Sequence, residues 1–222
     1  MICTDLRPGR SATSLDFAIV QPETANDDDR GCIIDAAYGC LSEPHSGPVP
    51  VAAILQRAGV SSRAFYRHFA SKDELFLAML RRETDALAER LDRIVDEAPG
   101  DPVRRLRAWI EEMFGVINDA EVRMHLIVID SDEVRAAKGY RETREKAHSD
   151  RERSLVEILR GGRRDGTFPL AEPDRDAIAI SAVISRVLLS QSPDDEVGVR
   201  RSMDLVLDFA LRALGADRRR PL

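Results

Sequence analysis

The chain has 222 residues, of which 43% are hydrophobic, so it can bury a substantial core as one large domain or two smaller ones. Charged residues make up 32%, and the most apolar run, Ala177 to Ser190, falls short of the roughly 20 residues that cross a bilayer, which excludes an integral membrane protein. Asp5 comes early and no secretory signal is visible, so we expect a cytoplasmic protein without membrane contact.

The N-terminal third contains several short predicted helices. Residues 1–26 show no sustained periodicity, and we expect them to form a mobile tail. Apolar residues then recur at spacings of 3, 4 and 7, which predicts a helix capped by an acidic run. Breaker-rich residues 43–50 predict a loop, and Ser71 to Glu74 form a capping box that opens a long helix. The helices predicted here are 28–42, 51–58, 62–69 and the long helix to about residue 97.

Helical periodicity continues beyond a Pro- and Gly-rich break. The helices predicted there are 103–119, 121–136, 140–161, 174–190 and 197–214. A long turn is predicted at 161–169, where Gly161 and Gly162 end a helix. No strand signal is present, so we expect an all-α fold with an N-terminal three-helix helix-turn-helix domain at 27–75 and a helical C-terminal domain at 76–222.

Acidic residues are unevenly distributed along the chain. The net charge is −6 at pH 7, yet residues 44–72 contain no Asp or Glu and carry Arg57, Arg63, Arg67 and Lys72. A local basic window is the footprint of a phosphate-contacting surface, whatever the charge of the whole chain. Since a basic run by itself is more often a solvated face, the interpretation depends on the helices beneath it.

Two short helices joined at Gly59, Val60 and Ser61 constitute a helix-turn-helix. The sharp reversal needs a positive φ, which Gly59 can adopt, and Ser61 can cap the second helix. Phe65 and Phe69 lie four residues apart on one face and are expected to point into the small domain. The outward-facing residues of the second helix are then Ser62, Arg63, Tyr66 and Arg67.

The stretch from Gly59 to Leu75, GVSSRAFYRHFASKDEL, resembles the signature of TetR-family (tetracycline-repressor-like) transcriptional regulators. The similarity extends back to Ile34–Ala37 and covers about 50 residues. The chain departs from the family pattern at Pro44–His45, where Arg-Gly is usual, and at Val49–Pro50, where Thr residues commonly touch phosphate. The resemblance implies an all-helical homodimer with an effector-binding C-terminal domain. We expect a DNA-binding transcriptional regulator, a repressor that a small-molecule effector releases from a palindromic operator; the alternative is an activator.

The resemblance also assigns DNA-binding roles by position. Residues that would face the bases or nearby phosphates are Ser62, Arg63 and Arg67. Positions that commonly hold the DNA backbone are Tyr66, His68 and Lys72, and the capping Ser61 completes the candidate site. An Arg side chain can donate two hydrogen bonds to guanine O6 and N7, whereas Tyr and Lys more often contact phosphates.

Each of these residues also has a plainer interpretation. Tyr66 could be a partly buried core aromatic, and His68 could bond a free carbonyl at the end of its helix. Arg63 and Arg67 could be solvated surface charges. Lys72 at a helix N-terminus is unfavourable for the helix dipole, so DNA binding explains it better than stability does.

The last two predicted helices each carry an apolar stripe, and we expect them to form a four-helix bundle between the subunits of a homodimer. The first stripe comprises Ile178, Ala182, Ser185 and Leu189, broadened by Ile180, Ile184 and Val187. The second comprises Met203, Val206, Phe209, Ala210 and Leu214. The alternative is that both stripes only close the core of their own subunit.

Candidates for an effector pocket lie in the middle helices, and each could equally be ordinary core. They are Trp109, Met113, Met124, His125 and Tyr140. No zinc-ligand spacing or phosphate-binding loop is present, so we expect no metal, no cofactor and no enzyme activity. A purely architectural DNA binder is also disfavoured, because it would be basic along its whole length.

Overall fold

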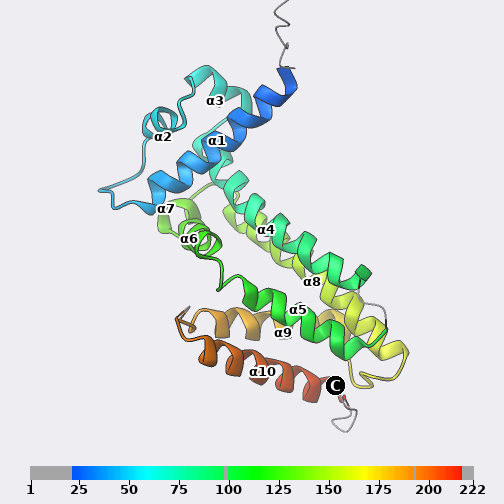
Figure 1. The fold of residues 1–222 in the computed structure, drawn as a ribbon. Helices are drawn as coiled ribbons and strands as arrows, with labels where there is room; N and C mark the ends of the chain where they lie inside the picture. Colours follow the sequence, from blue (N-terminus) through cyan, green and yellow to red (C-terminus); the bar gives the residue numbers. More distant parts are fainter. Residues whose placement is uncertain (1–21, 98–99, 193, 217–222) are drawn as a thin grey trace, which may run out of the picture.

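The computed structural model describes residues 22–97, 100–192 and 194–216, and every regular element in these ranges is an α-helix (Figure 1). The helices are α1 (Pro22–Ser42), α2 (Val51–Ala58), α3 (Ser62–His68), α4 (Lys72–Glu97), α5 (Pro102–Gly115), α6 (Ala120–Ile129), α7 (Asp132–Arg135), α8 (Tyr140–Arg164), α9 (Pro173–Leu188) and α10 (Glu196–Ala213). The all-α class predicted from the sequence is therefore confirmed.

The molecule is elongated, with the helix-turn-helix at one end (Figure 1). Helices α1, α2 and α3 pack together at that end. Helices α4 and α8 pack side by side along the middle, and α5, α9 and α10 complete the opposite end. The long helices therefore connect the helix-turn-helix to the remainder of the fold.

Two hydrophobic cores lie along this axis. The upper core, at the helix-turn-helix end, includes Ile33, Ile34, Tyr38, Ile54, Phe65, Phe69, Leu75, Met79, Val128, Ile129 and Val134. The lower core includes Leu91, Leu106, Trp109, Ile110, Met113, Leu155, Ile158, Phe168, Ile180, Ile184, Val206 and Ala210. Burial of each large apolar side chain contributes about 1.5–3 kcal/mol. Because α6 and α7 add residues to the upper core, a division of the chain at residues 75 and 76 does not coincide with the division between the cores.

The first helix begins earlier than predicted. Helix α1 starts at Pro22 rather than at Asp28, and proline suits the first turn of a helix. Residues 1–21 of the expected tail lie outside the described residues.

The helix predicted over 121–136 is two helices, α6 and α7, with a break at Asp130 and Ser131. Ser131 has extended backbone angles. Short polar side chains such as these favour helix ends over helix interiors, because they compete for backbone hydrogen bonds.

The two glycines of α8 do not end it. The helix continues through Gly161 and Gly162 to Arg164. Gly162 is buried, and a Cβ atom there would overlap the ring of Phe168. The chain turns instead at Gly166, whose φ of 79° is costly for other residues. Gly162 therefore permits a close approach of Phe168 rather than a helix end.

The apolar stripes of the last two helices are partly buried in the subunit's own core and partly exposed at the surface. On α9, Ile180 and Ile184 are buried in the lower core, whereas Ile178 is 60% and Leu189, just past the helix end, 81% exposed. On α10 the buried residues are Val206 and Ala210, joined by Leu214 just past the helix end, while Leu205 and Phe209 are exposed. Part of each predicted stripe thus closes the subunit's own core, and another apolar face lies at the surface.

Replacing Gly162 by Ala should destabilise the protein by about 1–3 kcal/mol, because the new methyl group overpacks against Phe168. Gly161 provides the matched control, since open space surrounds its Cβ position. Gly161→Ala should be neutral or stabilising by up to about 1 kcal/mol, as Ala favours the helix. Urea unfolding of both variants measures the difference. Equal stability of the two variants would contradict this role for Gly162.

Candidate nucleic-acid interface

The helix-turn-helix is built as its sequence predicts. Gly59 ends α2 with a φ of 68°, and its N–H donates to the carbonyl of Leu55. Ser61 then caps α3, since its Oγ accepts a hydrogen bond of 3.2 Å from the N–H of Ala64. These local contacts fix the turn between the two short helices.

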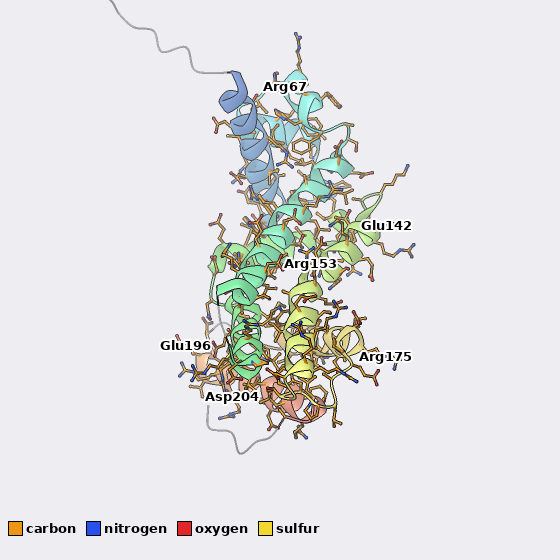
Figure 2. The ribbon with its side chains drawn as sticks, turned by 90° about the vertical axis from the view of Figure 1, so that its right-hand side faces the viewer. Arg67, Glu142, Arg153, Arg175, Glu196 and Asp204 are labelled. Carbon is orange, nitrogen blue, oxygen red and sulfur yellow. The ribbon has the colours of Figure 1, made fainter. Side chains whose placement is uncertain are left out.

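Burial of one face determines which residues of α3 are available for binding. Phe65 is fully buried and Phe69 is 2% exposed, with ring centroids 5.6 Å apart. The opposite face is at the surface, and its side chains are those of Ser62, Arg63, Tyr66 and Arg67. Tyr66 is 66% exposed, so its interpretation as a core aromatic is wrong. Figure 2 shows Arg67 at the end of the molecule formed by α1, α2 and α3.

His68 and Lys72 are less exposed than these four residues. His68 is half-buried, and its Nε2 is buried without a hydrogen-bond partner among the described residues. Lys72 begins α4 and lies close to Glu133 of α7, with its ammonium group 5.2 Å from the centre of the Phe76 ring. The structure therefore brings four of the candidates onto one open face, with Ser61 exposed at its start and Lys72 beside it in an ion pair.

Acidic residues from outside the basic window pair with three of its four cations. The pairs are Arg57–Glu43 and Arg67–Asp29, each with 2.7 Å between nitrogen and oxygen, and Lys72–Glu133. Arg63 is exposed and has no ion-pair partner in the described part of the chain. In the free protein the positive charge of this surface is thus largely balanced, and Arg63 is its most available cation.

Glu133 ties α7 to the helix-turn-helix. Its carboxylate accepts hydrogen bonds of 3.0 and 3.2 Å from the N–H of Val49, just before α2, and one from Lys72 at the start of α4. His45 Nε2 lies 3.6 Å away. The Glu133 side chain is 18% exposed, so these contacts are partly shielded from water. A displacement of α7 would therefore disturb the entry to both α2 and α4.

A second junction joins α6 to α1. The ring of His125 stacks on Tyr38 with centroids 3.7 Å apart, and His125 Nδ1 lies 2.8 Å from a carboxylate oxygen of Glu83. The Tyr38 hydroxyl donates to the carbonyl of Met79 at 2.9 Å. Burial raises the pKa of Tyr38 well above its usual range, with the nearby Glu83 carboxylate adding to the effect, so the hydroxyl stays protonated as a donor.

The five candidate effector residues do not lie together. Trp109 and Met113 are buried in the lower core. His125 is in the junction with α1, and Met124 and Tyr140 pack against the upper core. The sequence could not distinguish these two locations, because all five are compatible with ordinary core packing.

Two surface grooves lie elsewhere on the helical body. One of about 300 Å³ lies between α4 and α8 and is lined by Arg81, Thr84, Asp85, Glu142, Thr143, Lys146, Ala147 and Asp150. Another of about 400 Å³ lies between α5 and α10 and is lined by Glu111, Phe114, Gly115, Asn118, Glu196, Val199, Arg200 and Met203. None of the five candidate effector residues lines either groove.

Sequence reasoning missed Asp29 and Glu133 as neighbours of the candidate interface. Asp29 belongs to the acidic run interpreted as a helix cap, and no local pattern relates it to Arg67. Glu133 contacts Lys72 across 61 positions of sequence. Co-variation between such positions is the kind of signal that could find these contacts.

Among the described residues, no group of three or more His, Cys, Asp or Glu side chains is arranged to hold a metal ion. Likewise, no described helix is long and apolar enough to cross a membrane.

An exposed second helix in an N-terminal helix-turn-helix, set on an all-helical body, defines a DNA-binding transcription regulator. The family described as "Bacterial regulatory proteins, tetR family" matches residues 33–79. The HTH-type transcriptional repressor KstR2 of Mycobacterium tuberculosis is 30% identical over 149 residues, which are 66% of this chain and 71% of KstR2. The chain belongs to the tetR family of bacterial regulatory proteins.

Other relatives match over different extents. The HTH-type transcriptional activator FasR of Mycolicibacterium smegmatis is 35% identical over 91 residues, 41% of this chain and 41% of FasR, so the match spans less than half of that relative. The structure of SmeT in complex with triclosan has a TM-score of 0.69 at 26% identity and covers 83% of this chain and 90% of SmeT. The fold is thus shared through the C-terminal half as well.

Proposed function

We propose that the chain is a cytoplasmic repressor that binds a near-palindromic operator as a homodimer and acts by binding rather than by catalysis. The observation that carries the proposal is the open face of α3, where Arg63 and Tyr66 are exposed on a helix fixed by Phe65 and by the Ser61 cap. A helix of this kind fits the major groove of DNA. Membership of a family of regulatory proteins supports the same conclusion.

In the proposed complex, α3 of each subunit enters one of two successive major grooves. The centres of the half-sites then lie one DNA turn apart, about 34–36 Å. Arg63 and Arg67 are positioned for bases, and Ser61, Ser62, Tyr66 and His68 for the backbone or adjacent bases. Lys72 contacts phosphate after exchanging its ion pair with Glu133 for the DNA.

Replacing Arg63 by Ala should weaken operator binding by about 1–3 kcal/mol and relax the preference at one base position per half-site. Tyr66→Phe keeps the ring contact with Phe65 but lacks the hydroxyl, so it should weaken all sequences alike. Arg175→Ala is the control, since Figure 2 shows Arg175 far from Arg67. Titrations on a selected operator and its single-base variants separate these behaviours. Unchanged binding in both α3 variants would mean that α3 does not enter the groove.

We propose that the exposed apolar face of α9 and α10 packs against a second copy of the chain. This face includes Ile178, Leu189, Val197, Leu205 and Phe209. Helices α9 and α10 lie at the end of the molecule away from α3 (Figure 1). A two-fold dimer matches the symmetry of a palindromic site and leaves both α3 helices free. Exposed large apolar side chains gathered on neighbouring helices are typical of protein interfaces.

Leu205→Asp should convert the dimer to a monomer, because it places a charge in the apolar interface. Ile127→Asp is the matched control, since Ile127 is 74% exposed on α6, outside this face. Sedimentation velocity at micromolar concentration should show a dimer for the wild type and the control. A monomeric wild type, or a dimeric Leu205→Asp variant, would argue against this interface.

An apolar or amphipathic effector in the helical body completes the proposed mechanism. SmeT, which shares the fold, was solved in complex with triclosan, and this supports an apolar compound as the effector. The effector must bind more tightly to a dimer conformation with one spacing of the two helix-turn-helix domains than to a conformation with another spacing. An effector with equal affinity for both conformations would not shift the equilibrium between them. The junctions at Glu133 and His125 are suited to carry the change from α6 and α7 to α2, α4 and α1.

Titration with triclosan and long-chain fatty acids tests the effector. At least one probe should raise the melting temperature, as any ligand of the folded state does, and should also weaken operator binding. A probe that raises the melting temperature without changing operator affinity would show binding without coupling. If no apolar probe changed operator affinity, a constitutive repressor would be the better description.

A further inference from the structure

The N-terminal part of α1 brings a carboxylate to the outer face of α3. Asp29 Oδ2 lies 2.7 Å from Nη2 of Arg67, and the two residues are 38 positions apart in the chain. The Asp29 side chain is 34% exposed and that of Arg67 is 53% exposed. An acidic side chain is thus part of the surface that faces DNA in the proposed function, on which this inference rests.

A carboxylate in this position opposes DNA binding in general. Non-specific affinity comes from cations that replace the counterions of phosphates. Asp29 neutralises Arg67 and so leaves one cation fewer for the phosphates of any duplex, whatever its sequence. Arg63, without a partner among the described residues, carries no such penalty.

The same contact favours one geometry of Arg67. A guanidinium has five N–H donors in a rigid fork, and Asp29 is hydrogen-bonded to Nη2. The other nitrogens can still donate to a guanine edge while the pair persists. A phosphate contact gains less, because phosphate and carboxylate compete for the same positive charge. Restricting the side chain in advance also reduces the conformational entropy that base recognition would otherwise cost.

We propose that Asp29 is a specificity-determining residue, which positions Arg67 for a base and suppresses binding to unrelated DNA. Its effect is on the ratio of operator to non-specific affinity more than on operator affinity itself. The sequence interpretation of this acidic residue as part of a helix cap is wrong, because Asp29 lies inside α1, which begins at Pro22.

Asp29→Asn removes the charge and changes the shape little. Asp35→Asn is a matched control on the same helix, because Asp35 pairs with Arg82 of α4, at 2.6 Å, rather than with α3. Both variants, the wild type and Arg67→Ala are titrated on a selected operator and on a scrambled duplex at several salt concentrations. Melting temperatures monitor folding.

Asp29→Asn should bind the scrambled duplex about three- to tenfold more tightly at about 0.1 M salt, with a salt slope steeper by about one unit, as Arg67 becomes free to neutralise a phosphate. Operator affinity should change less, so the specificity ratio falls. Asp35→Asn should retain the wild-type ratio. In the Arg67→Ala background, Asp29→Asn should no longer change the salt slope.

An unchanged ratio in Asp29→Asn, or an equal loss on both duplexes with a lowered melting temperature, would overturn the inference and leave Asp29 a packing residue. A slope change that persists without Arg67 would overturn the positioning role. These results would leave the proposed function intact if Arg63→Ala still weakens operator binding. A wild type that binds operator no better than scrambled DNA would overturn both.

Discussion

Helix α4 supplies side chains to both hydrophobic cores, and the rest of the structure depends on this shared helix. Leu75 and Met79 near its start are buried in the upper core, and Leu91 further along is buried in the lower core. Close-packed interiors transmit displacement rather than absorb it. The helix-turn-helix therefore cannot reorient without moving α4 against α8. Helices α6 and α7 provide a second connection, because they pack in the upper core with the helix-turn-helix. The helix-turn-helix is therefore packed against the rest of the protein and is not a module on a flexible linker.

The cations of the candidate interface differ in how available their charge is. Arg63 has no ion-pair partner among the described residues, whereas Arg67 and Lys72 share their charge with acidic residues from α1 and α7. Arg67 and Lys72 must give up an ion pair before they contact phosphate, so they add less to non-specific affinity than an unpaired cation does. Such a surface favours DNA that offers matching contacts to base edges in addition to phosphate charge. An overall acidic chain can thus be a selective DNA binder.

Local signals predicted most of the helices and the exposed face of α3, because caps and turns depend on near neighbours; Gly59 adopts the expected conformation. Contacts between distant residues have no such signal, and the pairing of Asp29 with Arg67 could not be predicted. Periodicity also could not decide which apolar face of α9 is buried. Ile178 and Ile180 are equally hydrophobic, yet the first is at the surface and the second in the core, as packing against α8 determines.

Trp109 is an intrinsic fluorescence probe. It is the single tryptophan of the sequence, fully buried in the lower core, where its indole N–H donates to Ser154 Oγ at 2.9 Å. Its emission therefore arises from one dry, hydrogen-bonded position in the body. DNA binding at α3 changes this environment only if a rearrangement extends through α4. The fluorescence of the unlabelled protein therefore distinguishes changes confined to the helix-turn-helix from changes that reach the lower core.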